Sequence, residues 1–125
     1  MSRIIRFRAW DKTQETMIRS ELVELGWSVE QLTTNNNFEI MQFTGLKDKN
    51  GKEIFEGDIV RCFGGENYLA TIVWNHGGFE MKWHKESIRT VEGMQEPLLT
   101  NITIDAEIIG NVFEHPTLLD NKEGL

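Results

Sequence analysis

The chain has 125 residues, of which 39% are apolar, and its formal net charge is -7 at pH 7. This length fits a single domain, and the apolar share is sufficient for a hydrophobic core without disulfide or metal support. Cys62, the single cysteine, excludes an internal disulfide and lies in an apolar run, so we predict a buried thiol in a reducing compartment. No apolar stretch approaches the roughly 20 residues of a membrane-spanning helix, and we predict a cytoplasmic protein without a membrane segment.

The negative charge is concentrated in the C-terminal third of the chain. Residues 1–90 carry 12 Lys or Arg against 13 acids, a net of -1, whereas residues 91–125 carry one lysine against seven acids, a net of -6. Non-specific affinity for nucleic acid comes mainly from neutralising phosphates, so this balance disfavours nucleic acid as a partner. A protein partner could instead meet residues 91–125 with a basic surface.

The first half of the chain predicts strands joined by turns. Ile5, Phe7 and Ala9 alternate with Arg6, Arg8 and Trp10, and turn residues begin at Asp11. This pattern predicts a hairpin over residues 4–18. A short helix is predicted at residues 19–25. Alternation resumes at residues 38–43, and Asn50–Gly51 predicts a hairpin tip because this pair tolerates positive φ angles.

The second half continues this pattern. Further strands are predicted at residues 53–55, 59–63, 68–74, 79–83 and 107–113, with a polar excursion at 84–98 and a short edge at 102–104. Short strands separated by Gly and Asn turns favour an all-β fold with at most one or two short helices. Its form would be a small curled sheet or a partly open SH3-like barrel. We expect one domain over residues 1–119 and a frayed tail at 120–125.

Three blocks of the sequence resemble the YopX family of small phage and prophage proteins. They are residues 6–11 (RFRAWD), residues 41–60 (MQFTGLKDKNGKEIFEGDIV) and residues 108–116 (IIGNVFEHP). Residues 19–37 and 84–104 lie outside the matched blocks. The resemblance implies a mainly β fold and a phage or prophage origin, and it transfers no activity to any residue of this chain.

The hairpin tip is the first candidate recognition surface. It displays Lys47, Asp48, Lys49 and Lys52, and loops held by a rigid scaffold often carry binding residues. The alternative interpretation is structural, because the glycine and asparagine residues of this segment are explained by turn chemistry alone.

The first strand supplies the second candidate surface. Arg6, Arg8 and Trp10 share one face, and arginine beside indole can grip phosphates or stack nucleobases. Alternatively, Trp10 packs under a crossing loop while both arginines pair with the acids of residues 91–125.

The sequence contains no recognisable catalytic or metal-binding motif. His76, His84 and His115 lack the spacing of a helical metal site, and the glycine pairs 64–65 and 77–78 are predicted as turns because neither opens a helix. A small metal-dependent hydrolase using Asp58 and Glu56 is conceivable, but no nucleophile, base and orienting group occur together. We therefore predict no cofactor, no metal and no catalytic residue.

The sequence thus favours a non-enzymatic interaction or regulatory module that acts on an unidentified host or phage protein. The first alternative is a nucleic-acid binding module that uses Arg6, Arg8, Trp10 and the hairpin at residues 47–52. The second alternative is the small hydrolase. A second copy of the chain could also pair with an exposed strand edge near residues 38–43 or 107–113.

Overall fold

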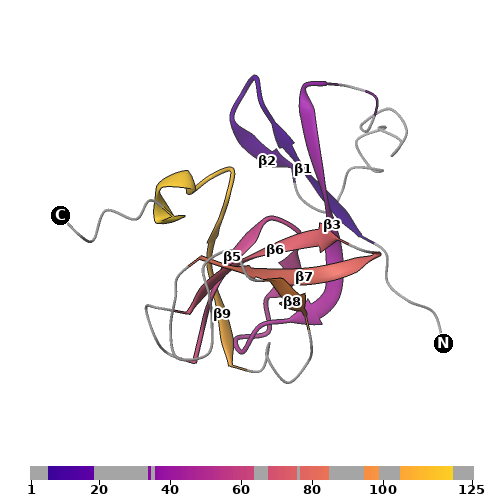
Figure 1. Cartoon of the computed structure of the whole chain (residues 1–125). Coiled ribbons are helices and arrows are strands. Elements are labelled where there is room, and N and C mark those ends of the chain that lie inside the picture. The colour runs from indigo at the N-terminus through magenta and orange to yellow at the C-terminus, as the bar shows by residue number, and fades with distance from the viewer. Residues whose placement is uncertain are drawn as a thin grey trace.

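Nine strands in two antiparallel sheets form the described part of the protein (Figure 1). The computed structural model describes residues 6–18, 34, 36–63, 68–75, 77–84, 95–98 and 105–119. A short 3₁₀ helix, η1 (Pro116–Leu119), follows the last strand. The predicted all-β class is confirmed, with one strongly curled sheet and a second sheet beside it. Within the described residues, no helix has the length and apolarity needed to cross a bilayer.

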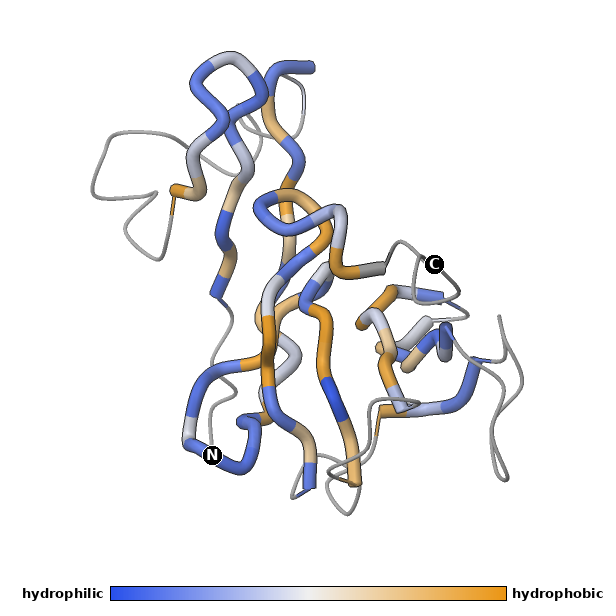
Figure 2. The backbone as a smooth tube through the Cα atoms, turned by 90° about the vertical axis from the view of Figure 1, so that its left-hand side faces the viewer, coloured by the Kyte–Doolittle hydropathy of each residue, from blue (hydrophilic) through white to orange (hydrophobic). Residues whose placement is uncertain are grey.

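The first sheet has the strand order β2-β1-β3-β4. Its strands are β1 (Phe7–Asp11), β2 (Thr16–Ile18), β3 (Phe38–Lys47) and β4 (Glu53–Phe55). The hydrophilic turn between β1 and β2 (Figure 2) is held by Asp11, whose Oδ1 accepts the backbone N–H groups of Thr13 at 3.0 Å and Gln14 at 3.1 Å. The predicted first hairpin is confirmed.

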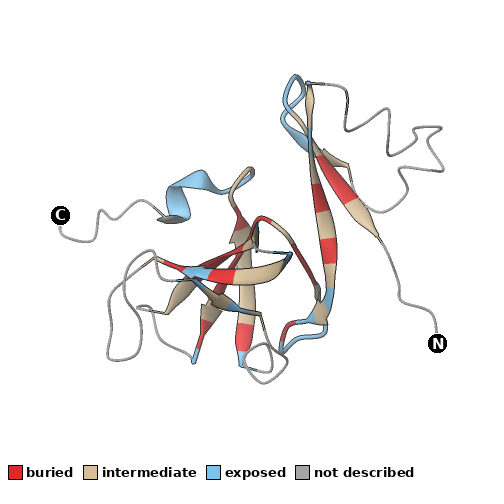
Figure 3. Ribbon diagram, turned by 45° about the vertical axis from the view of Figure 1, so that its right-hand side comes forward, coloured by how far each residue is buried: buried red, intermediate tan, exposed pale blue. Residues whose placement is uncertain are grey.

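Strand β3 is longer than the sequence predicts, because it continues through Gly45 to Lys47. It pairs with β1 over Phe38–Gln42 and with β4 between Phe43 and Lys47. The register shifts within this second part, where Gly45 has a φ of +88°. In the sequence, this glycine suggests that the strand ends. In the structure, it lies at a bulge inside a continuous strand. Buried and less buried positions alternate along β3 (Figure 3).

The second sheet has the order β8-β7-β6-β5-β9. Its strands are β5 (Asp58–Cys62), β6 (Leu69–Asn75), β7 (Gly78–Trp83), β8 (Gln95–Pro97) and β9 (Ala106–Asn111). The predicted meander of β5, β6 and β7 is confirmed. Strand β8 lies inside the segment predicted as a polar excursion. That expectation was wrong because a three-residue edge strand containing proline leaves no alternating apolar signal.

Several sequence predictions fall outside the described residues. These are the helix at 19–25, the glycine pair at 64–65, the edge at 102–104 and the tail at 120–125.

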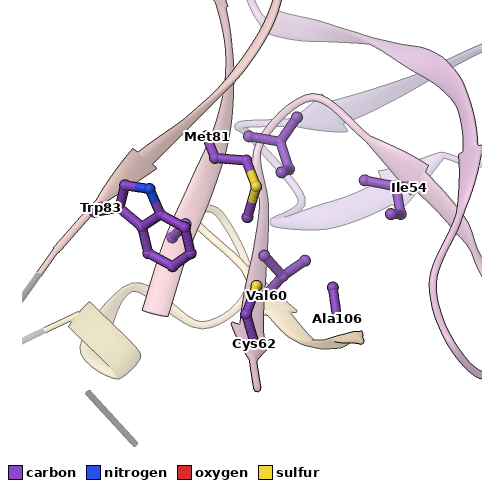
Figure 4. Close-up of a cluster of buried hydrophobic side chains, with 8 residues drawn as sticks. Ile54, Val60, Cys62, Met81, Trp83 and Ala106 are labelled. Atoms are coloured by element: carbon purple, nitrogen blue, oxygen red, sulfur yellow. The ribbon is translucent and has the colours of Figure 1, made fainter. Parts of the chain in front are cut away.

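The core lies inside the curl of the second sheet (Figure 4). Its largest side chain is that of Trp83, which is fully buried and donates its indole N–H to Glu96 Oε1 at 2.8 Å. Met81 and Cys62 are also fully buried, as the alternation of β7 and the apolar context of the cysteine predict. The remaining buried members of this cluster are Ile54, Val60, Ala70, Ile72 and Ala106.

The turn between β4 and β5 joins the two sheets at Gly57. Its N–H donates to the carbonyl oxygen of Ile72 at 2.8 Å, and its own carbonyl oxygen accepts the N–H of Val112 at 3.0 Å. Gly57 has a φ of +90°, and a Cβ at this position would lie 3.2 Å from Met41 Sδ. Both the backbone conformation and the close approach of Met41 therefore require glycine here.

We expect the substitution Gly57→Ala to lower the free energy of unfolding by about 1–3 kcal/mol, since it combines backbone strain with a tight contact. Gly51→Ala is the matched control, because Gly51 has a φ of +83° but no atom within 4 Å of its added Cβ. Urea denaturation of both variants should show the larger loss for Gly57→Ala. Equal losses would mean that the contact with Met41 contributes nothing.

Candidate functional site: a cleft between the two sheets

A cleft of about 580 Å³ lies between the two sheets. One side is formed by β1, β4 and the adjoining turns, and the other by β9 and the turn that follows it. The lining residues are Arg6, Arg8, Lys52, Glu53, Phe55, Asp58, Ile108, Ile109, Gly110, Asn111, Glu114 and His115. The cleft therefore combines charged side chains of both signs with an apolar surface.

A buried ion pair between Arg8 and Asp58 forms part of this lining. Arg8 Nη2 donates to Asp58 Oδ1 at 2.7 Å, and the two side chains are only 3% and 2% exposed. The second carboxylate oxygen, Oδ2, accepts the backbone N–H of Phe55 at 2.7 Å. The guanidinium lies 4.9 Å from the centre of the Phe55 ring. These contacts hold β1 against the turn between β4 and β5.

Arg6 lies two residues before Arg8 and is much closer to solvent. Its guanidinium forms an ion pair with Glu53, and the two side chains are 35% and 29% exposed. It also lies over the ring of Phe43, 5.7 Å from the ring centre. Arg6 and Arg8 thus line the same cleft at different depths, which the strand period alone does not distinguish.

Trp10, the third residue of the predicted binding face, packs against the end of the second sheet. Its ring stacks on that of Phe113, with the centres 5.9 Å apart and the planes at 23°. This packing agrees with the alternative prediction, in which Trp10 packs under a crossing loop. Arg6 pairs with Glu53 and Arg8 with Asp58, and both of these acids lie outside the acidic segment 91–125 that the alternative named.

The hairpin tip is anchored to β9 by Asp48, which is 6% exposed. Its Oδ1 accepts the backbone N–H groups of Asn50 at 2.8 Å and Lys52 at 2.9 Å, and its Oδ2 accepts that of Ile108 at 3.0 Å. The N–H of Lys49 also donates to the carbonyl oxygen of Ala106 at 2.9 Å. The predicted tip at residues 50–51 is confirmed, with Asp48 turned inward.

The lysines of the tip have the opposite environment. Lys47, Lys49 and Lys52 are all exposed, and Lys52 lines the cleft. Of the four tip residues predicted as a recognition loop, the three lysines are therefore exposed. The fourth, Asp48, is buried and fixes the position of the tip through its hydrogen bonds.

The other end of β9 is closed by the turn that contains His115. The N–H of Asn111 donates to His115 Nδ1 at 3.3 Å, and the N–H of His115 donates to the carbonyl oxygen of Asn111 at 2.9 Å. Gly110 allows this approach, since a Cβ there would lie 2.8 Å from His115 Nδ1. Asp48 accepts the N–H of Ile108, and His115 accepts that of Asn111. The outer edge of β9 is therefore hydrogen-bonded within the chain at both ends. Little of that edge is left for an added strand.

The two carboxylates considered for metal-dependent hydrolysis have other partners. Both oxygens of Asp58 are hydrogen-bonded, as described above, and Glu56 Oε1 accepts the backbone N–H of Gln42 at 3.4 Å. Burial raises the pKa of Glu56, while the Gln42 hydrogen bond and the charge of Arg8 oppose the increase. His84 Nε2 lies 2.5 Å from Thr71 Oγ1, and His76 is outside the described residues. In the part of the chain that the structure describes, no three His, Cys, Asp or Glu side chains are grouped to hold a metal.

A smaller hollow of about 250 Å³ lies between β3 and the β6–β7 hairpin. Trp74, which is 53% exposed, lines it together with Phe79, and their rings meet edge to face at 4.9 Å. None of its lining residues is charged. No pattern in the sequence indicates this hollow.

A binding role was not predicted from the sequence for several residues of the main cleft, above all for Glu53, Ile109 and His115. A signal for them exists, because every lining residue belongs to one of the three blocks that resemble the YopX family, residues 6–11, 41–60 and 108–116. These blocks are far apart in the sequence and meet around the cleft.

The model of the YopX protein family matches residues 6–120. The chain belongs to the YopX family. The crystal structure of protein EF1440 from Enterococcus faecalis is similar over 94% of this chain and 99% of that chain, with a TM-score of 0.64 and 25% sequence identity. No curated protein sequence matches this YopX-family chain.

We expect Asp58→Ala to lower the free energy of unfolding by about 3–5 kcal/mol, because it leaves the Arg8 charge buried without its carboxylate. The matched control is Glu107→Ala, which breaks the Arg61–Glu107 pair at 3.0 Å, whose side chains are 40% and 34% exposed. An exposed pair of this kind contributes about 0–1 kcal/mol. Urea denaturation should separate the two variants clearly, and similar small losses would show that the buried pair is dispensable.

Glu56 leads to a prediction about pH. Because its pKa is raised above 4.5 in the folded protein, the folded state binds this proton more tightly than the unfolded chain does. Its ionisation therefore lowers stability as the pH rises through the interval between the two pKa values. Glu56→Gln should be more stable than the wild type at neutral pH, and the difference should disappear below pH ~4. Urea denaturation at both pH values tests this, and a variant that is less stable at neutral pH would contradict it.

Proposed function

We propose that this YopX-family protein is a non-enzymatic interaction module, and that it receives part of a partner protein in the cleft between its two sheets. The observation that carries the proposal is the convergence of the three family blocks on this one cleft. The resemblance to phage and prophage proteins further suggests a host or phage protein as the partner, met in the cytoplasm.

The size and chemistry of the cleft support binding. Its volume of about 580 Å³ falls within the roughly 300–1,000 Å³ of typical ligand sites. Ile108 and Ile109, which are half-buried, offer apolar contact, while Arg6 and Lys52 offer charged groups near solvent. Apolar surface with a few polar groups is the usual composition of a recognition site.

The framework of the cleft is held in place before any partner binds. The Arg8–Asp58 pair fixes the side formed by β1 and β4, and Asp48 and His115 fix the two ends of β9. Such preorganisation reduces the entropy lost on binding. The bonds along the edge of β9 also favour the entry of side chains over the addition of a complete strand.

The nucleic-acid alternative receives less support from this geometry. Arg8 is buried in an ion pair and Trp10 is stacked on Phe113, so two of its three proposed contact residues on β1 face the interior between the sheets. The exposed lysines of the hairpin tip remain as a cationic surface that could contact phosphates, and the experiment below therefore includes nucleic acid as an outcome.

We expect the substitution Ile109→Trp, which fills the cleft without changing its charge, to abolish capture of the partner protein. The tagged wild type and variant would be compared in host lysate with and without nuclease, at low and high salt, with mass spectrometry of the retained proteins and quantification of the retained nucleic acid. Val73→Trp is the matched control, since Val73 lies half-buried on β6 outside the cleft. Thermal unfolding would confirm that both variants fold.

Three outcomes are distinguishable. A protein retained by the wild type and Val73→Trp but lost from Ile109→Trp supports the proposal. Equal retention by all three contradicts the cleft as the site. Nucleic acid that is recovered without nuclease and lost at high salt would replace the proposal with the nucleic-acid alternative.

A further inference from the structure

We infer that the partner segment received by the cleft is acidic, and that Arg6 exchanges the carboxylate of Glu53 for one from the partner. This inference rests on the proposed function and specifies the chemistry of its partner. It comes from two features of the cleft, the charge of the hairpin tip and the difference between two neighbouring arginine–carboxylate pairs.

The hairpin tip is a local cationic surface on an acidic protein. Lys47, Lys49 and Lys52 are exposed, and no carboxylate lies within ion-pair distance of them among the described residues. The acid between them, Asp48, is buried and accepts three backbone N–H groups. Lys52 lines the cleft, whereas Lys47 and Lys49 lie on the same tip outside the lining. The tip therefore places positive charge beside the cleft, which favours an anionic segment there.

Arg8 is unable to supply its charge to a partner at low cost. Its pair with Asp58 is almost completely buried, and the second oxygen of Asp58 is bonded to the N–H of Phe55. Separating these groups would leave charges in a site with little access to water. The pair is therefore a fixed part of the cleft.

Arg6 has the opposite properties. About a third of its side chain and of Glu53 is exposed, and exposed ion pairs contribute little to stability because water and salt screen them. An incoming carboxylate can take the place of Glu53 on the guanidinium while Glu53 turns to solvent. Lys52, next to Glu53 in the sequence and also on the cleft lining, supplies a second cation for the same segment.

The remaining lining favours an acidic peptide over a nucleic-acid backbone. Glu53 and Glu114 lie on the lining and repel anions of either kind, whereas the half-buried Ile108 and Ile109 offer apolar contact that a phosphate backbone does not use. A peptide that places carboxylates beside apolar side chains matches both kinds of surface. We therefore commit to an acidic protein segment as the occupant.

The test uses the purified full chain and a short fluorescent peptide of alternating Glu and Leu, with Gln in place of Glu as the comparison peptide. Fluorescence anisotropy should show tighter binding of the Glu peptide, weakening with added salt. Glu53→Gln should raise affinity for the Glu peptide about three- to tenfold, since it removes the competing carboxylate from Arg6. Lys52→Gln should lower it.

The matched control for the gain in affinity is Glu107→Gln. It changes the net charge of the chain by the same amount and removes the carboxylate of an ion pair with similar exposure, but Glu107 is not on the cleft lining. Affinity should rise for Glu53→Gln alone. An equal rise for both variants would mean that only the net charge matters, and no rise for Glu53→Gln would overturn the exchange.

Two further outcomes would overturn the inference. One is that the Glu and Gln peptides bind equally, and the other is that a single-stranded oligonucleotide binds more tightly than the Glu peptide and responds to the same variants. Failure of the inference alone is recognisable, because Ile109→Trp would still abolish capture of the partner protein. If Ile109→Trp leaves capture unchanged, the proposed function itself fails.

Discussion

The arrangement of the two sheets depends on the buried ion pair between Arg8 and Asp58. Arg8 comes from the second position of β1 and Asp58 from the first position of β5, so the pair links the two sheets directly. Replacing a buried ion pair with apolar residues is often neutral for stability. Its main effect here is therefore to fix the position of one sheet relative to the other. A charge pair with defined geometry tolerates fewer arrangements of the sheets than an apolar contact does.

This constraint determines which other charges are available for recognition. Because Asp58 pairs with Arg8 and Asp48 accepts backbone N–H groups of the hairpin and β9, the charged groups near the cleft that retain access to solvent are Arg6, Glu53, Glu114 and the lysines of the tip. The same segments that hold the sheets together thus present the charges with which a partner would interact. The residues that stabilise the fold and those proposed for recognition are therefore neighbours in the sequence.

The sequence predicts the local features of this fold well. Alternation identifies β1, β7 and the core position of Trp83, and Asn50–Gly51 locates the hairpin tip, because these signals depend only on neighbouring residues. It does not predict the pairing of β5 with β9, since contacts between distant segments leave no local pattern. For the same reason the alternation at the start of the chain places Arg6 and Arg8 on one face but does not reveal that Arg6 is partly exposed and Arg8 is buried.

The pairing of β5 with β9 also sets the order in which the cleft can form. Strand β5 (Asp58–Cys62) cannot complete its pairing until β9 (Ala106–Asn111) is present. Closing a connection of that length is slower than forming the local hairpins of β1–β2 and β6–β7. During synthesis from the N-terminus, most of the first sheet can assemble before β9 has left the ribosome. The surface proposed for recognition is therefore completed late, and a nascent chain that has not reached β9 has only one side of it.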